Sequence, residues 1–86
     1  MTYEFGGFFG RALYELNGLP DEVRHGLLFE RILQLLDAPW DAVPIRPGQT
    51  AERHAFFGHG DSHGMITFII DDDAKVLRFT DIVWLC

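Results

Sequence analysis

The spacing of hydrophobic residues predicts two helices in the first half of the chain. Between Phe9 and Asn17, apolar residues recur at the spacing of one helix face, and Asn17-Gly18 supplies residue types that end a helix. Pro20 and the two acidic residues after it favour a helix N-terminus, and a second apolar stripe then continues to about Asp37. The members of this second stripe are Val23, Leu27, Leu28, Ile32, Leu35 and Leu36.

Four segments around these helices have the composition of strands. Residues 2–8 mix β-forming residues with a glycine pair, which predicts a first strand that bends at the glycines. Between the second helix and residue 49, the prolines at 39, 44 and 47 predict an irregular connection. Separators rich in Gly or Asp then favour antiparallel hairpins between the three remaining runs, which are Glu52–Gly58, Met65–Ile70 and Val76–Leu85.

The order of these elements, β-α-α-β-β-β, predicts an α+β fold. We expect a mostly antiparallel four-stranded sheet with the two helices packed on one face. A chain of 86 residues has the length of a single domain, so one domain over residues 1–86 is expected.

Composition and charge limit the functions to consider. The net charge of −6 repels phosphate backbones and argues against a high-affinity, non-specific nucleic-acid binder. The one locally basic stretch is residues 44–60, with Arg46 and Arg53 against Glu52 alone. Cys86 has no intrachain partner for a disulfide, and no apolar run approaches the ~20 residues that span a bilayer. We expect a soluble cytoplasmic protein without membrane contact.

Several local sequences are similar to those of one protein family. They are the opening Met1–Phe5, the Arg-Ala-Leu-x-x-Leu helix at Arg11–Leu16, the bridge Leu19-Pro20 and the hairpin Ile70–Val76. Together they resemble the RelE/ParE superfamily of type II toxin–antitoxin toxins over nearly the whole chain. The resemblance implies the same α+β fold. It also implies either mRNA cleavage, by a metal-free set of basic and acid/base side chains on the open sheet face, or inhibition of DNA gyrase, as in ParE-like members.

The sequence departs from the family pattern where RNA-cutting members carry their basic site. Met65 stands where those members have an Arg before the hairpin. Asp81 and Trp84 stand near the end of the last strand, where Arg, His or Tyr is usual. The resemblance therefore does not supply a complete catalytic set.

Strand alternation sorts the remaining side chains between the two faces of the sheet. If Leu77, Phe79, Val83 and Leu85 face the helices, four residues of the last strand face outward: Arg78, Thr80, Ile82 and Trp84. Ala55 and Phe57 are expected to face inward. The outward positions of the neighbouring strands are then Glu52, His54, Phe56 and Thr67.

This arrangement predicts a catalytic trio on the open face. RNA cleavage by transesterification needs a base, an acid and a cation for the phosphate. Glu52 as base, His54 as acid and Arg78 as phosphate clamp meet these needs, and the first two roles are interchangeable. An ordinary cross-strand pair of Glu and Arg is the alternative. We expect the RNA-binding residues to be Arg46, Arg53 and Trp84, with Phe56 as another stacking surface. A solvated surface role is the alternative for the two arginines. A core or dimer-interface role is the alternative for Trp84.

No metal or other cofactor is expected. The histidines at 54, 59 and 63 lack the fixed helical spacing of a zinc site, and Asp71-Asp72-Asp73 lacks the ligand spacing of a calcium loop and predicts a turn.

Two functions fit these observations. The first is a RelE-like endoribonuclease that cleaves RNA without metal and is weakened by loss of basic residues. The alternative is a non-catalytic toxin-fold module that binds a second copy of itself or an antitoxin. A homodimer is expected in either case, because aromatic residues are abundant and Asp81–Cys86 would be an apolar edge strand.

Overall fold

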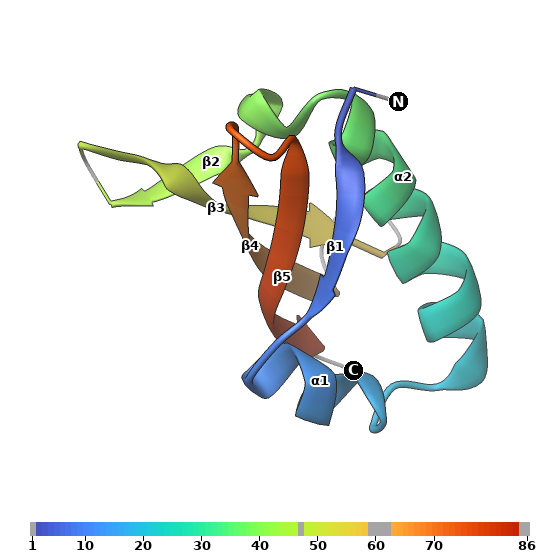
Figure 1. The fold of residues 1–86 in the computed structure, drawn as a ribbon. Helices are drawn as coiled ribbons and strands as arrows, with labels where there is room; N and C mark the ends of the chain where they lie inside the picture. The colour runs from blue at the N-terminus through green and yellow to red at the C-terminus, as the bar shows by residue number, and fades with distance from the viewer. Residues whose placement is uncertain (1, 47, 59–62, 85–86) are drawn as a thin grey trace.

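A five-stranded mixed sheet with helices beside it forms the fold (Figure 1). The structure is a computed structural model that describes residues 2–46, 48–58 and 63–84. The strands lie in the order β1-β5-β4-β3-β2. The elements are β1 (Glu4–Phe8), α1 (Arg11–Leu16), η1 (Val23–Leu28), α2 (Phe29–Asp37), η2 (Pro39–Asp41), β2 (Val43–Arg46), β3 (Gln49–Phe57), β4 (Gly64–Asp71) and β5 (Val76–Trp84). The predicted α+β class is confirmed.

The second predicted helix is continuous from Asp21 to Asp37, but its winding changes along its length. Its η1 part is a π-helix, with one more residue per hydrogen-bonded turn than the α-helical part α2. The predicted apolar stripe is confirmed, because its members pack against the sheet. Five of them are buried, namely Val23, Leu28, Ile32, Leu35 and Leu36, and Leu27 is partly buried. Among the described residues, none of the helices has the length and apolar character needed to cross a membrane.

Helix α1 is shorter than the predicted segment 9–17, and it lies at the end of β1 and β5 (Figure 1). Ala12 is fully buried and Leu16 packs at the margin of the core. Phe9 and Leu13, which the spacing assigned to the same stripe, are 46% and 57% exposed. Helix α1 therefore buries only half of its predicted apolar face.

The sheet has one strand more than the predicted four. Val43–Arg46, within the segment expected to be irregular, pairs antiparallel with β3 as β2. Proline is tolerated in a strand at the edge of a sheet, and Pro44 occupies such a position. The expected position of the last strand is also wrong: β5 lies between β1 and β4, not at an edge, and its pairing with β1 is parallel.

An irregularity in β5 reverses the predicted sides of its last residues. Thr67 of β4 pairs with Asp81 and the next residue, Phe68, pairs with Phe79, so Thr80 is an extra residue in β5. Such a bulge shifts the alternation of side chains beyond it. Ile82, predicted to face outward, is 1% exposed in the core. The prediction for Leu85 lies outside the described residues.

Large side chains from the central strands fill the core between the sheet and the helices. Those that are almost fully buried include Phe57, Phe68, Phe79, Leu28, Ile66, Leu77 and Ile82. Burial of one such side chain contributes about 1.5–3 kcal/mol to folding. The three central strands are therefore held mainly by their inner face, which leaves the outer face available for polar side chains.

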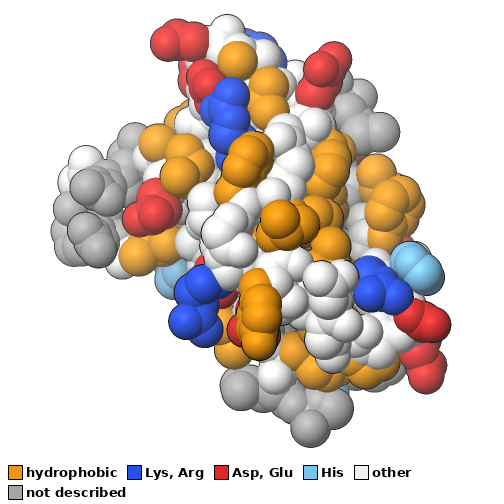
Figure 2. All heavy atoms as spheres, turned by 60° about the horizontal axis from the view of Figure 1, so that its bottom comes forward, with side chains coloured by type: hydrophobic (Ala, Val, Ile, Leu, Met, Phe, Trp, Pro, Cys, Tyr) orange, Lys and Arg blue, Asp and Glu red, His pale blue; other side chains and the backbone are white. Residues whose placement is uncertain are grey.

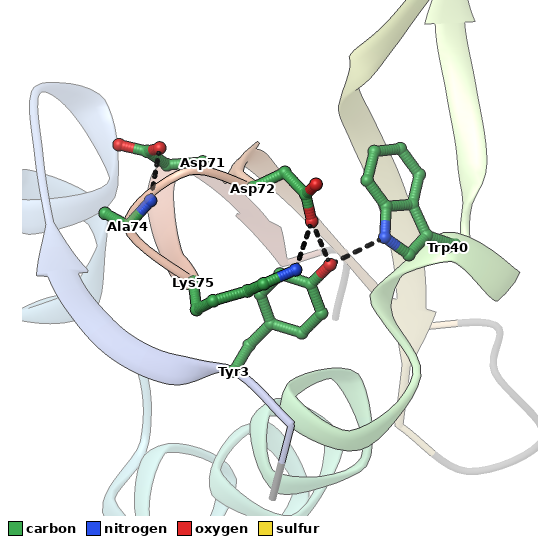
Figure 3. A network of polar contacts seen from close by, with 6 residues as sticks. All are labelled: Tyr3, Trp40, Asp71, Asp72, Ala74 and Lys75. Atoms are coloured by element: carbon green, nitrogen blue, oxygen red, sulfur yellow. Dashed lines mark hydrogen bonds and ion pairs between the residues drawn. The ribbon is translucent and has the colours of Figure 1, made fainter.

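A polar clasp of Tyr3, Trp40, Asp72 and Lys75 joins three distant segments (Figure 3). The Tyr3 hydroxyl donates a hydrogen bond to Asp72 Oδ1 at 2.6 Å and accepts one from Trp40 Nε1 at 2.8 Å. Lys75 Nζ lies 2.9 Å from the same oxygen of Asp72. The clasp therefore ties the start of the chain to η2 and to the turn between β4 and β5.

We predict that Tyr3→Phe lowers the free energy of unfolding by about 1–2 kcal/mol. The substitution keeps the buried ring but removes the acceptor of the Trp40 N–H and the donor to Asp72. Urea unfolding measures the change. Tyr14→Phe is the matched control, because Tyr14 is 79% exposed and its hydroxyl lies outside the clasp. Equal midpoints for Tyr3→Phe and the wild type would show that the clasp adds no stability.

We also predict that Asp72 makes the fold sensitive to acid. Its hydrogen bond from Tyr3 and its contact with Lys75 hold the pKa of the Asp72 carboxyl below its usual value of 3.8. A lowered folded-state pKa gives stability that is present above the unfolded-state pKa and is lost as the pH falls through the folded-state pKa. Urea unfolding at pH 7 and pH 2.5 should therefore show a smaller loss of stability for Asp72→Asn than for the wild type. Asp73→Asn, which removes a charge from the same turn, should keep the loss seen in the wild type.

Candidate functional site on the open face of the sheet

The face of the sheet away from the core carries polar side chains in two cross-strand rows. One row consists of Glu52, Ile69 and Arg78, and the next of His54, Thr67 and Asp81. Side chains on neighbouring strands have Cβ atoms about 5 Å apart, and those two strands apart lie about 10 Å apart. The structure therefore brings the predicted trio Glu52, His54 and Arg78 onto one face, with Arg78 across β4 from the other two.

Arg78 is engaged with a carboxylate other than Glu52. Its Nη1 lies 2.7 Å from Asp71 Oδ2, at the end of β4. The hydrogen bond from Arg78 and a second one from the Ala74 backbone N–H lower the pKa of the Asp71 carboxyl. The cross-strand pair of Glu52 with Arg78, which was the alternative to a catalytic role, is absent from the contacts found among the described residues. A phosphate that binds Arg78 has to share it with Asp71 or replace that carboxylate.

Asp81 and Arg11 are members of this face that strand alternation did not predict. Asp81 lies opposite Thr67 and accepts hydrogen bonds from its neighbour's backbone, Ile82 N–H at 2.9 Å, and from Arg11 Nε at 3.4 Å. The sequence held one signal: strict alternation from Phe79 would bury Asp81, where an unpaired carboxylate is costly. Arg11 comes from α1, and no local pattern indicates that it reaches β5.

An exposed aromatic side chain lies beside the predicted acid. The rings of His54 and Phe56 have centroids 5.5 Å apart and meet edge to face at 68°. Phe56 is 43% exposed and lies opposite Met65, so a base of a bound nucleotide has an apolar ring next to His54 on which to stack. Of Phe56 and Trp84, the two predicted stacking surfaces, Phe56 therefore fits the stacking role.

Trp84, the other residue considered for stacking, packs against the core instead. Its ring is stacked on that of the buried Phe57, with centroids 5.6 Å apart and an angle of 19°. The prediction that Trp84 faces outward is wrong, because the bulge in β5 turns the residues beyond it to the other side. Its indole does not share a face with Glu52 and His54.

Arg53 has a structural position where a phosphate contact was predicted. Its side chain is almost fully buried, donates to the carbonyl oxygens of Trp40 at 2.9 Å and Ala42 at 2.6 Å, and lies 4.9 Å from the centre of the Trp40 ring. The guanidinium therefore satisfies backbone groups around η2, and the exposure needed for phosphate binding is missing. The side chain of Arg46, the other predicted contact, lies outside the described residues.

Metal-ligating side chains do not cluster in the part of the chain that the structure describes. Within residues 2–46, 48–58 and 63–84, no group of three or more His, Cys, Asp or Glu side chains is arranged to hold an ion. His54 and His63 are described, while His59 lies outside these ranges. The groups that the open face offers within these ranges are acid/base and cationic side chains.

An apolar groove of about 380 Å³ lies on the other side of the molecule, between β1 and the helices. Its walls include Phe5, Leu16 and Phe29, with Arg24 and His25 at its rim. Phe5 is 48% and Phe29 55% exposed, so the groove presents two aromatic side chains to the surface. Figure 2 shows one face of the molecule, on which hydrophobic side chains gather across the middle and most charged side chains lie toward the margins.

Comparison by sequence finds no match, but comparison by structure finds proteins of similar fold. No family model matches the chain, and no curated protein matches it significantly. The isolated E. coli RelE toxin is similar in structure, with a TM-score of 0.74, 19% identity and coverage of 98% of this chain and 85% of RelE.

Two further RelE structures agree with this result. An E. coli RelE mutant with two Arg-to-Ala changes, in complex with a peptide of the antitoxin RelB, gives a TM-score of 0.74 at 23% identity, over 95% of this chain and 82% of that chain. The intact E. coli RelBE toxin–antitoxin complex gives a TM-score of 0.70 at 19% identity, over 98% and 96%. The chain therefore has the fold of the RelE toxin.

Proposed function

We propose that this chain is a RelE-like ribonuclease that cleaves RNA on the open face of the sheet. The observation that carries the proposal is the strand register. It places Glu52 and His54 two residues apart on β3, with Arg78 in the Glu52 row and Asp81 in the His54 row. The RNA-cutting members of the superfamily that the sequence resembles work on the same face with side chains alone.

The proposed reaction is a transesterification within the RNA. Glu52 removes the proton of the 2′-hydroxyl, whose oxygen attacks the adjacent phosphorus and forms a 2′,3′-cyclic phosphate. The bond from phosphorus to the 5′-oxygen breaks, and His54 donates a proton to this leaving oxygen. The roles of Glu52 and His54 are interchangeable, and Arg78 balances the negative charge that develops on the phosphate.

The charges on the open face are a reason to expect a low rate of cleavage. Arg78 and Arg11, the cations described there, each lie against a carboxylate, Asp71 and Asp81 respectively. The phosphate therefore competes with a carboxylate for each cation. Ion pairs at the protein surface contribute little stability, about 0–1 kcal/mol, so the exchange is possible but gives little net attraction.

We predict that His54→Ala reduces the cleavage rate about 10²-fold or more. This is the usual scale for the loss of one general acid or base, a role that histidine fills more often than any other side chain. The assay uses labelled single- and double-stranded RNA in buffer with EDTA, and the 2′,3′-cyclic phosphate or 3′-phosphate end is identified in the products. Arg78→Ala is expected to be severely impaired in the same assay.

The matched control is His25→Ala, which removes an exposed histidine of η1 on the side of the molecule away from β3. It should cleave at the wild-type rate. Wild-type cleavage by His54→Ala, or activity that appears only with added magnesium or manganese, would contradict the proposed mechanism.

A second candidate function is protein binding without catalysis, and the apolar groove favours it. Exposed Phe5 and Phe29 in one groove are typical of a surface that contacts another protein. RelE itself is found in complexes with the antitoxin RelB. In this proposal the groove binds a second copy of the chain or an antitoxin-like partner, and the cytoplasmic toxin fold serves as a binding module.

We predict that the protein associates as a homodimer through this groove. The wild type should sediment at about twice the chain mass of 9.8 kDa at micromolar concentration, and Phe29→Asp should sediment as a single chain because it places a charge in the apolar surface. Tyr14→Asp is the matched control, since Tyr14 is exposed but does not line the groove. If the wild type sediments only as a 9.8 kDa species, the prediction of self-association is wrong.

A further inference from the structure

A second cavity, of about 490 Å³, lies on the helix side of the molecule, where the π-helix η1 faces the end of β5. Its volume falls in the range of small-ligand sites, about 300–1,000 Å³. None of the residues proposed for RNA cleavage lines it. The cavity is therefore separate from the open face of the sheet.

The helix wall of the cavity presents two carboxylates on either side of a gap. Glu22, Gly26 and Glu30 follow one another at intervals of four residues and all line the cavity. A Cβ atom added at Gly26 would meet no atom within 4 Å, so the absence of a side chain there leaves open space. The π-helical winding of this segment is itself frequent at functional sites.

The opposite wall is aromatic. The Trp84 ring lines the cavity, is backed by the stacked ring of Phe57, and lies 5.9 Å from the ring of His63. The indole N–H is buried and has no hydrogen-bond partner among the described residues. The position of this ring is therefore set by ring contacts rather than by a hydrogen bond.

We propose that this cavity binds a small organic cation, an ammonium or guanidinium group with an apolar body. The face of a tryptophan ring attracts cations through its quadrupole, and weakly hydrated organic cations gain most from such contacts. Glu22 and Glu30 add negative charge at the rim, while Val23 and Leu27 offer apolar surface to the body of the ligand. The same carboxylates repel anions, and an uncharged ligand has no charge for them to attract.

The test is a titration of the ¹⁵N-labelled protein with choline and, separately, with agmatine, followed by the indole N–H signals in NMR spectra. Trp84 and Trp40 give two such signals, which Trp84→Phe assigns. We expect the Trp84 signal to shift with saturation while the Trp40 signal stays in place, and the affinity to fall as salt is added. The uncharged analogue of choline, with carbon in place of nitrogen, should produce no saturable shift.

Two variants test whether the helix wall of the cavity takes part in this binding. Replacing Glu22→Gln and Glu30→Gln together should raise Kd about tenfold, because two attractions to the cation are lost. Gly26→Leu should abolish binding without loss of stability, since its side chain enters open space. Glu4→Gln, which removes an exposed carboxylate on β1 that does not line the cavity, should leave Kd unchanged.

Three outcomes would overturn the proposal. They are an equal shift with the uncharged analogue, unchanged binding by the double Glu variant, and unchanged binding by folded Gly26→Leu. The proposal is supported if the wild type binds the cations saturably, the double Glu variant binds them more weakly, and Gly26→Leu does not bind them.

Discussion

The extra residue Thr80 in β5 determines what each face of the sheet carries. In a regular strand, Asp81 would follow Phe79 into the core and Ile82 would face outward. A carboxylate buried without a partner is costly, and the bulge avoids this cost by moving Asp81 to the open face while Ile82 enters the core. One strand thereby completes the core, turns Trp84 toward the helices and supplies a charged group in the same cross-strand row as His54.

Local patterns in the sequence were enough for most of the fold, and failed where a tertiary contact decides the outcome. Helical spacing located both helices, and short polar separators located the hairpins that join β3, β4 and β5. The strand β2 was not predicted, because it contains Pro44 and because its pairing is with β3, a contact that the local sequence does not indicate. The positions of Glu52 and His54 followed from alternation, but the burial of Arg53 depends on backbone carbonyl groups near η2 that no spacing reveals.

Among the residues that the structure describes, the cations make contacts that leave few of them free to attract a nucleic acid. Arg53 is used in the interior, Lys75 belongs to the clasp with Asp72, and Arg11 and Arg78 are paired across the open face. The net charge of −6 thus has a local counterpart, because a carboxylate accompanies each of Arg11, Lys75 and Arg78. For the proposed ribonuclease, recognition of RNA would depend on shape and ring stacking more than on long-range attraction.

The parallel pairing of β1 with β5 has a consequence for the synthesis of the protein on the ribosome. Glu4 pairs with Val76, and Tyr3 reaches Asp72, which is 69 residues away in the chain. Contacts between such distant residues form late, because a long loop has to close first. The first strand and both helices therefore emerge long before their partners exist. A translation product that stops before β5 lacks the strand between β1 and β4, and so it has neither a closed core nor an assembled open face.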